Sequence, residues 1–280
     1  MSDGSPDEGA GRLVETRLTV LCWNLAWRFD DGWAAREPLI VDVLRAADAD
    51  VVALQEVWDD GDENQAERLG RSLGLNWTYE KITAIDGVDL GLAVLSRWPI
   101  AGREGHALPS MPSAGGRRDR RAMFAAIDGP RGRIGVFNTH LSWPLEESHM
   151  RQEQVRSLVG FVARTRIDGF PPLVCGDFNA PPSADEIRMM TGETTCPVEG
   201  LYFIDAWGLA CPGEPGHTWS NRNPLAIGHL EPDRRLDYIF VGAPADNGAG
   251  HVLRARLAGV RTTRGLPPSD HYALIAELRY

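Results

Sequence analysis

Six short segments spread along the whole chain combine apolar, β-forming residues with polar groups able to hold a metal or a phosphate. They are residues 20–24, 51–56, 136–140, 173–179, 236–240 and 269–272. One such strand end carries little information, but six in one chain predict that the fold gathers their polar side chains into a single site. Those side chains are Asn24, Glu56, His140, Asp177, Asn179, Asp237, Asp270 and His271. Four of them are carboxylates, which repel one another when crowded unless a cation or a proton intervenes. The set therefore predicts a metal.

The pattern between these segments predicts alternating strands and helices, with the order of the first half repeated in the second. Helices are expected at 33–47, 63–73 and 147–165, and Ser183 is expected to cap a short helix that starts at Ala184. Residues 103–118 are rich in Gly, Pro and Ser and are expected to form a long surface loop. This alternation indicates mixed sheets covered by helices. We expect a disordered tail over 1–16 and one domain over 17–280.

Composition limits the classes of function. The net charge of −10 argues against a protein that coats duplex DNA, which needs a broad basic face. Arg117, Arg118, Arg120 and Arg121 form a local basic exception that could meet a phosphate. The chain contains no apolar run near the roughly 20 residues that span a bilayer, and its first residues lack the features of a signal peptide. A cytoplasmic location is therefore expected. Pairing of Cys196 with Cys211 stays open.

Gly176-Asp177-Phe178-Asn179 is the most specific local motif. Asp177 and Asn179 are two residues apart in an extended chain, so they point the same way while Phe178 points into the core. Asp177 could orient or deprotonate a water molecule, and Asn179 could donate to a phosphate oxygen. The competing explanation for these two residues alone is an Asx turn before Pro181.

Ser269-Asp270-His271 places an acid beside a base. Neighbouring residues of a strand face opposite ways, so Asp237 is the better partner for His271 than Asp270 is. The ordinary alternative is a surface histidine beside an aspartate. Likewise, a lone Glu56 is more often a solvated acid at the start of a loop, and a lone His140 is more often structural.

Trp27, Trp58 and Trp143 each follow one of the polar strand ends closely. They could form an aromatic rim that stacks a base or shields a lipid. The alternative is that they pack in the core, as most tryptophans do.

Taken in this order from Leu18 to Tyr280, these motifs resemble the endonuclease/exonuclease/phosphatase superfamily. The resemblance implies a four-layer α/β sandwich, in which two mixed sheets face each other and helices lie outside. It also implies roles for the strand-end residues. Glu56, Asn24 and Asp270 would bind Mg²⁺ or Mn²⁺, and Asp177 would position or activate the attacking water. Asn179 and His140 would bind phosphate, and His271, backed by Asp237, would stabilise the phosphate or serve as the acid.

The histidine of Asn138-Thr139-His140 resembles the deoxyribonuclease, sphingomyelinase and phosphatase branches and disfavours the AP endonucleases. The leading hypothesis is therefore a Mg²⁺-dependent hydrolase of a small phosphoester: a nucleotide, a sugar phosphate or a lipid headgroup. Its substrate would meet Arg120, Arg121, Trp58 and Trp143. The first alternative is an intracellular nuclease on single-stranded DNA or RNA. The second is an inactive binding protein with the same fold.

Overall fold

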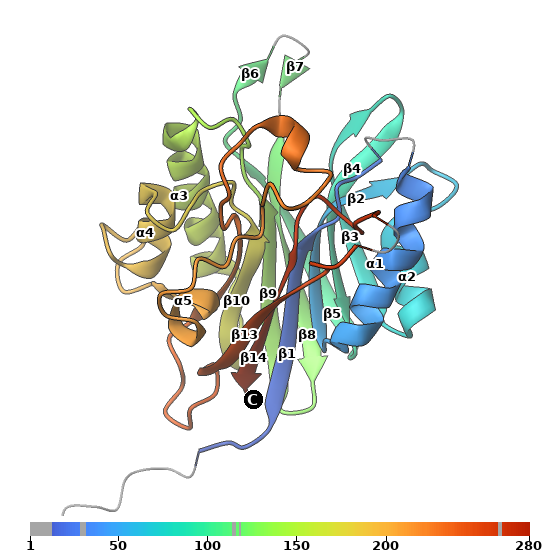
Figure 1. Ribbon diagram of the computed structural model, residues 1–280. Helices are drawn as coiled ribbons and strands as arrows, with labels where there is room; N and C mark the ends of the chain where they lie inside the picture. Colours follow the sequence, from blue (N-terminus) through green and yellow to red (C-terminus); the bar gives the residue numbers. More distant parts are fainter. Residues whose placement is uncertain (1–12, 29–31, 114–115, 118, 263–264) are drawn as a thin grey trace, which may run out of the picture.

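Two six-stranded mixed sheets lie face to face in this computed structural model, which describes residues 13–28, 32–113, 116–117, 119–262 and 265–280 (Figure 1). The first sheet has the order β13 (Val252–Ala258), β14 (Ala273–Arg279), β1 (Arg17–Asn24), β2 (Val51–Asp59), β4 (Val88–Ser96) and β3 (Asn76–Ile85). The second has the order β11 (Phe203–Asp205), β12 (Asp237–Gly242), β10 (Phe170–Asp177), β9 (Gly132–His140), β8 (Arg120–Gly129) and β5 (Ile100–Leu108). The short strands β6 (Pro112–Ser113) and β7 (Gly116–Arg117) form a separate hairpin.

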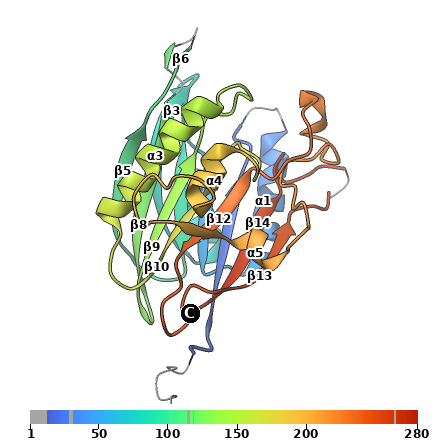
Figure 2. The same ribbon diagram turned by 90° about the vertical axis from the view of Figure 1, so that its left-hand side faces the viewer.

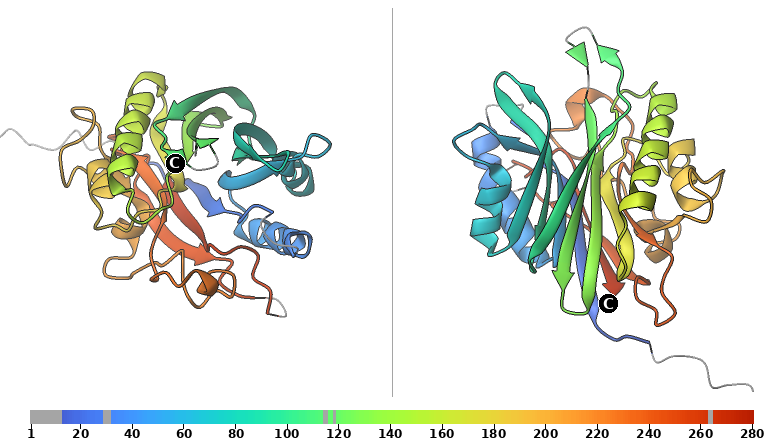
Figure 3. Two further views of the ribbon diagram at one scale, coloured as in Figure 1. Left: turned by 90° about the horizontal axis from the view of Figure 1, so that it is seen from above. Right: turned by 180° about the vertical axis from the view of Figure 1, so that it is seen from behind.

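Helices cover the outer faces of both sheets (Figure 3). Helices α1 (Trp33–Ala47) and α2 (Gln65–Leu73) pack on the first sheet, and α3 (Ser148–Thr165) and α4 (Asp185–Thr191) pack on the second (Figure 2). The shorter α5 (Ala206–Ala210) and the 3₁₀ turn η1 (Ile227–His229) lie in the chain between β11 and β12. One apolar core fills the space between the sheets, and one more lies under the helices of each outer face. The predicted four-layer α/β sandwich is confirmed.

The two halves contain the same unit of strand, helix and parallel strand. Strand β1 pairs with β2, and β9 pairs with β10, both in parallel. A parallel pair needs a long crossover connection, which α1 supplies in the first unit and α3 in the second. Because the strands of each pair run the same way, their polar carboxyl ends emerge at one edge of the sandwich.

Several local expectations were wrong. Residues 103–108, the start of the expected loop, belong to strand β5 instead, and among the described strands this edge strand pairs with β8 alone and exposes most of its side chains. It therefore lacks the alternating hydrophobic pattern by which strands are found. Ser183 does not cap α4, whose N-cap is Ala184 with no side-chain hydrogen bond. Helix α2 begins at Gln65, where Asn64 accepts from the Ala66 and Glu67 amides.

Part of the segment expected to be a tail is held to the fold by hydrogen bonds. Residues 1–12 lie outside the described residues, whereas the Val14 amide donates to the Asn247 carbonyl and the Val14 carbonyl accepts from Arg279. Cys196 and Cys211 are both free thiols. Within the described ranges, no helix combines the length and the apolar character needed to cross a membrane.

Candidate active site

The polar strand ends meet at one edge of the sandwich, where side chains from both sheets touch. Asn24 at the end of β1 is buried, and its amide nitrogen donates to Glu56 Oε1 at 3.2 Å and to Asp177 Oδ2 at 3.0 Å. Asn24 therefore connects a carboxylate of the first sheet to one of the second. The predicted convergence of these strand ends is what the structure shows.

Asp177 Oδ2 lies at the centre of this group. Besides Asn24, it lies 3.5 Å from His140 Nε2 and 3.7 Å from His271 Nε2. Burial raises the pKa of Asp177 to about 6, and the nearby charge of Asp237 acts in the same direction. A buried carboxyl with a pKa near neutrality suits proton exchange with water.

His271 is paired with Asp237, as expected from the sequence. His271 Nδ1 lies 2.8 Å from Asp237 Oδ2, and both side chains are buried. Burial lowers the pKa of His271, but the charges of Asp237 and Asp177 outweigh burial and hold this pKa well above its usual value. Asp270 points elsewhere and accepts from the Ser269 hydroxyl at 3.2 Å. The geometry therefore gives a cationic imidazole whose Nε2 faces Asp177.

Asn179 takes part in an Asx turn and also lies beside the site, so both explanations that the sequence left open apply to it. Its backbone amide donates to Asp177 Oδ1 at 2.9 Å, which is an Asx turn, and its φ of 51° turns the chain at the end of β10. The turn keeps Asn179 beside the site, where its side-chain nitrogen donates to the Leu141 carbonyl at 3.1 Å. An amide nitrogen carries two hydrogens, so a second donor remains for a ligand.

His140 is the neutral histidine of the site. Burial lowers its pKa well below the usual value, and the charges of Arg120 and His271 add to this effect. Its Nδ1 is buried and has no hydrogen-bond partner among the described residues. An imidazole without charge can still donate one hydrogen bond to a substrate oxygen.

The carboxylates of this edge fit a divalent cation. Burial raises the pKa of Glu56 to about 7, and repulsion from Asp270 adds to it. Glu56 has a φ of 58° and lies where the register between β2 and β4 shifts, so a bulge aims its carboxylate at Asn24. A hard cation bound here would relieve the repulsion, and carboxylate and amide oxygens are its preferred ligands. Glu56, Asp270 and Asn24 would hold it.

A second arrangement of possible ligands overlaps the first. Ligand atoms of Asp177, Asp237 and His271 lie within 4.8 Å of one another. The hydrogen bond between His271 and Asp237 already occupies Nδ1, so a metal there would have to compete with that pair. Asp237 Oδ1, however, is buried and has no partner among the described residues. We favour the Glu56 group because a cation there would not have to displace the pairing of His271 with Asp237.

The predicted aromatic rim is not formed by all three tryptophans. Trp58 is 1% exposed and packs edge-on against Trp33, with the Arg28 guanidinium 4.7 Å from its ring centre. Trp58 therefore offers no face to a substrate, and this assignment was wrong, because Trp58 is buried against residues that are distant from it in the sequence. Trp27 is also buried, whereas Trp143 is 55% exposed.

The arginine cluster is less available than its sequence suggested. Arg121 donates to Glu80 Oε1 at 2.7 Å, and Arg120 is buried close enough to His140 to influence its pKa. Arg118 lies outside the described residues. Of the two arginines in this cluster whose side chains the structure describes, Arg120 is the one placed beside the site.

Two residues of the site were missed in the sequence because they lie in a loop without periodicity. The Thr218 hydroxyl accepts from the Leu236 and Asp237 amides, and its carbonyl accepts from Tyr272. Trp219 packs edge-on against His271 with ring centres 5.1 Å apart. Both residues lie in segment 212–235 and hold the pair of Asp237 and His271 in place. No sequence motif marks them.

A cavity of about 470 Å³ lies between the start of α2 and β3. Its lining includes Asp59, Asp62, Glu63 and Glu67, and none of the eight strand-end residues. Its acidic wall does not suit a phosphate, so the chemistry of the strand ends, and not cavity size, identifies the site.

Comparisons with known proteins agree with this geometry. The model of the endonuclease/exonuclease/phosphatase family matches residues 21–271. The uncharacterized protein YbhP of Escherichia coli K12 is 30% identical over 256 residues, which cover 86% of this chain and 87% of YbhP. Inositol phosphosphingolipids phospholipase C of Schizosaccharomyces pombe is 28% identical over 213 residues, covering 71% of this chain and 47% of that protein.

A solved structure gives the same fold. The structure of D. rerio TDP2 complexed with single strand DNA product is similar, with a TM-score of 0.75. The match covers 95% of this chain and 100% of that one at 17% sequence identity. At this identity the likeness concerns the fold alone.

Proposed function

Because the chain belongs to the endonuclease/exonuclease/phosphatase family, whose members hydrolyse phosphoesters, we propose that it is a divalent-metal-dependent hydrolase of a small phosphodiester or phosphomonoester. The observation that carries the proposal is the meeting of Glu56, Asp177 and His271 at one buried edge. Burial raises the pKa of Glu56 to about 7 and that of Asp177 to about 6, and the charges of Asp270 and Asp237 respectively add to this, as expected where a cation and a phosphate bind.

Glu56, Asn24 and Asp270 would hold the ion, for which Mg²⁺ is the first choice and Mn²⁺ the second. When bound, the ion would neutralise charge on the phosphate and polarise its P–O bonds. The protein's own contribution is to place the Glu56 carboxylate in the bulge of β2 and the Asp270 carboxylate before β14, with the Asn24 side chain at the end of β1 bonded to Glu56.

The other side chains of the site act on the attacking water, on the phosphate oxygens and on the leaving oxygen. Asp177 Oδ2 accepts the proton of the water that attacks phosphorus, in keeping with its central place between Asn24, His140 and His271. His140 and Asn179 donate to the other phosphate oxygens. His271, an imidazolium whose Nδ1–H donates to Asp237, donates from Nε2 and supplies that proton to the leaving oxygen. The P–O bond to the leaving group breaks as the bond to water forms.

The substrate class follows from what surrounds this edge. Arg120 and the exposed Trp143 are the described residues proposed to meet the part of the substrate beyond its phosphate. Arg121 is held by Glu80, which weakens the basic track that a nuclease would need. A lipid headgroup belongs in the substrate panel because of the phospholipase C relative. The cytoplasmic location stays a prediction.

The test is hydrolysis by the purified protein, with Mg²⁺, with Mn²⁺ and with EDTA. The substrates are bis-p-nitrophenyl phosphate, p-nitrophenyl phosphate, a nucleotide panel, a sphingolipid phosphodiester and a single-stranded oligonucleotide. We expect metal-dependent release from at least one small phosphoester. Turnover that persists in EDTA would contradict the proposal, preference for the oligonucleotide would favour the nuclease, and no turnover on any substrate would favour an inactive binding protein.

A further inference from the structure

One buried arginine donates hydrogen bonds to backbone carbonyls in two loops of the site. Arg36 lies in the first turns of α1 and is 1% exposed. Its Nη2 donates to the Ala26 and Trp27 carbonyls, both at 2.8 Å, and its Nη1 donates to the Leu25 carbonyl at 3.0 Å. Arg36 Nη1 also donates to the Pro268 carbonyl at 3.2 Å. One guanidinium thus joins chain segments more than 230 residues apart.

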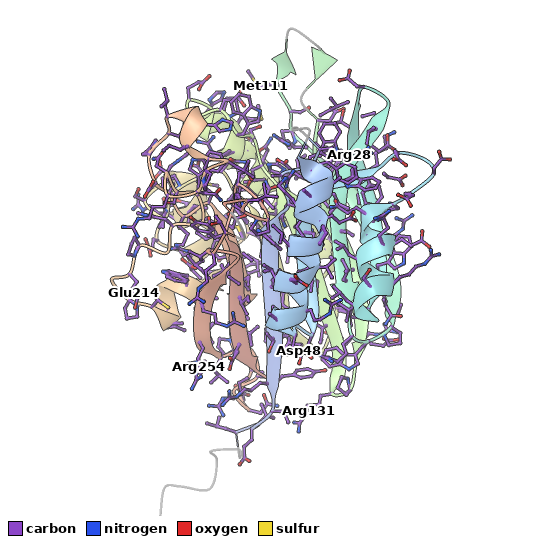
Figure 4. All side chains as sticks on the ribbon, turned by 45° about the vertical axis from the view of Figure 1, so that its right-hand side comes forward. Arg28, Asp48, Met111, Arg131, Glu214 and Arg254 are labelled. Atoms are coloured by element: carbon purple, nitrogen blue, oxygen red, sulfur yellow. The ribbon has the colours of Figure 1, made fainter. Side chains whose placement is uncertain are left out.

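The two segments that Arg36 joins carry the groups proposed to bind the metal. The loop 25–27 directly follows Asn24, whose side-chain oxygen accepts from the Ala26 amide at 2.9 Å. Pro268 directly precedes Ser269, whose hydroxyl donates to the Asn24 carbonyl at 2.7 Å. Figure 4 shows that α1 begins at the end of the molecule where Arg28 lies and stops near Asp48. The start of α1 therefore lies against the site loops.

We propose that Arg36 is a positioning residue that sets the distance between Asn24 and Asp270, and so the geometry of the cation site. This inference rests on the proposed function. Four carbonyls arranged around one planar fork match the five donors of a guanidinium, whereas an ammonium has only three donors and no fixed plane. The rigid plane of the guanidinium holds both loops in one conformation. The conformation of the loops then fixes the positions of the metal ligands.

The second half of the chain has an equivalent device, which supports a role for the first. Arg151 in α3 is buried and donates to the Ser142, Pro144 and Leu145 carbonyls in the loop after His140. The loops also start alike, because the Leu25 amide donates to the Gln55 carbonyl and the Leu141 amide to the Asp177 carbonyl. Arg151, however, is paired with Glu186 of α4, whereas Arg36 also donates to the Pro268 carbonyl in the loop before β14.

The experiment compares Arg36→Met and Arg36→Lys with two reference variants in the full chain. Arg45→Met is the matched control, since Arg45 lies on the same helix, is exposed and pairs only at the surface with Asp42. Arg151→Met is the comparison for the other loop. The readouts are hydrogen–deuterium exchange, Mn²⁺ binding by electron paramagnetic resonance, and kcat and KM on the best substrate.

Arg36→Met should raise exchange in peptides covering 24–28 and 266–271 together, and leave α3 unchanged. Mn²⁺ affinity and kcat should fall by about 10- to 100-fold, the range for residues that orient metal ligands, with KM little changed. Arg36→Lys should recover part of the loss, Arg151→Met should loosen residues 141–145 but not 24–28, and Arg45→Met should match the wild type.

Two results would overturn the inference: wild-type exchange in both segments of a folded Arg36→Met protein, or a uniform rise in exchange across the molecule, which indicates general stability. If the wild-type protein hydrolyses no substrate, the proposed function fails. Exchange and Mn²⁺ binding then still decide the role of Arg36.

Discussion

Asp177 is the residue on which the proposed chemistry depends most. Its Oδ2 accepts from Asn24 and lies near two imidazoles, and burial raises its pKa to about 6. Asp177→Asn keeps the shape but cannot accept a proton from water. We expect kcat to fall by about 10²- to 10⁴-fold, the range for loss of a general base. Thermal unfolding in EDTA should show stability equal to or above that of the wild type, because a costly buried charge is gone.

The dyad of Asp237 and His271 can be tested through the protonation of the imidazole. The charge of Asp237 is the main influence that raises the pKa of His271 against the effect of burial. In Asp237→Asn the burial effect should dominate, so the pKa of His271 should drop below the free value of about 6.5. Nuclear magnetic resonance titration of the His271 ring in EDTA measures this. An unchanged pKa would mean that other charges hold the imidazolium.

Glu56 predicts a pH dependence of stability in the metal-free protein. Its pKa is raised from 4.5 to about 7, so the folded state keeps a proton that the unfolded state has already lost between these values. Stability must therefore fall as pH rises through this window. Unfolding temperatures in EDTA at about pH 5 and pH 7.5 should differ less in Glu56→Gln than in the wild type. Saturating Mg²⁺ should also reduce the wild-type difference; an equal pH dependence in both proteins would contradict this.

At the scale of elements, the close approach of β9 and β10 sets where Asp177 and His140 lie. A Cβ at Gly176 would be 2.4 Å from the Thr139 carbonyl oxygen, so Gly176→Ala must push the two strands apart. We expect a loss of about 1–3 kcal/mol in the free energy of unfolding, as for other overpacked sites. Denaturant unfolding measures it, and activity should fall as well.

Gly160→Ala provides the control for this element prediction. Gly160 lies inside α3, and a Cβ there has no atom within 4 Å. Alanine in a helix interior should raise stability by about 0.5–1 kcal/mol, with no change in activity. Equal effects of the two substitutions on the free energy of unfolding would show that the close approach of β9 and β10 does not limit stability.

At the scale of the whole molecule, charge separates the small-substrate enzyme from the nuclease. The net charge is −10, and Arg121 of the basic cluster is paired with Glu80. For a small phosphoester, kcat/KM should change less than about twofold between 50 and 200 mM salt. A nucleic-acid substrate held by several phosphate contacts should lose about 10³-fold or more over the same range. Steep salt dependence on a small substrate would contradict the small-substrate assignment.

The sequence by itself determined the elements with strong periodicity and put the candidate site residues at their ends. Helix α1 and the strands that end in Asn24, His140 and Asp177 follow from local hydrophobic pattern, which depends only on neighbouring residues. Only the tertiary structure decided that residues 100–108 are a strand, that Trp58 is buried and that Arg36 joins two site loops. The same holds for the raised pKa of Asp177. Edge pairing, burial and repulsion act between segments that are distant along the chain, so no local pattern records them.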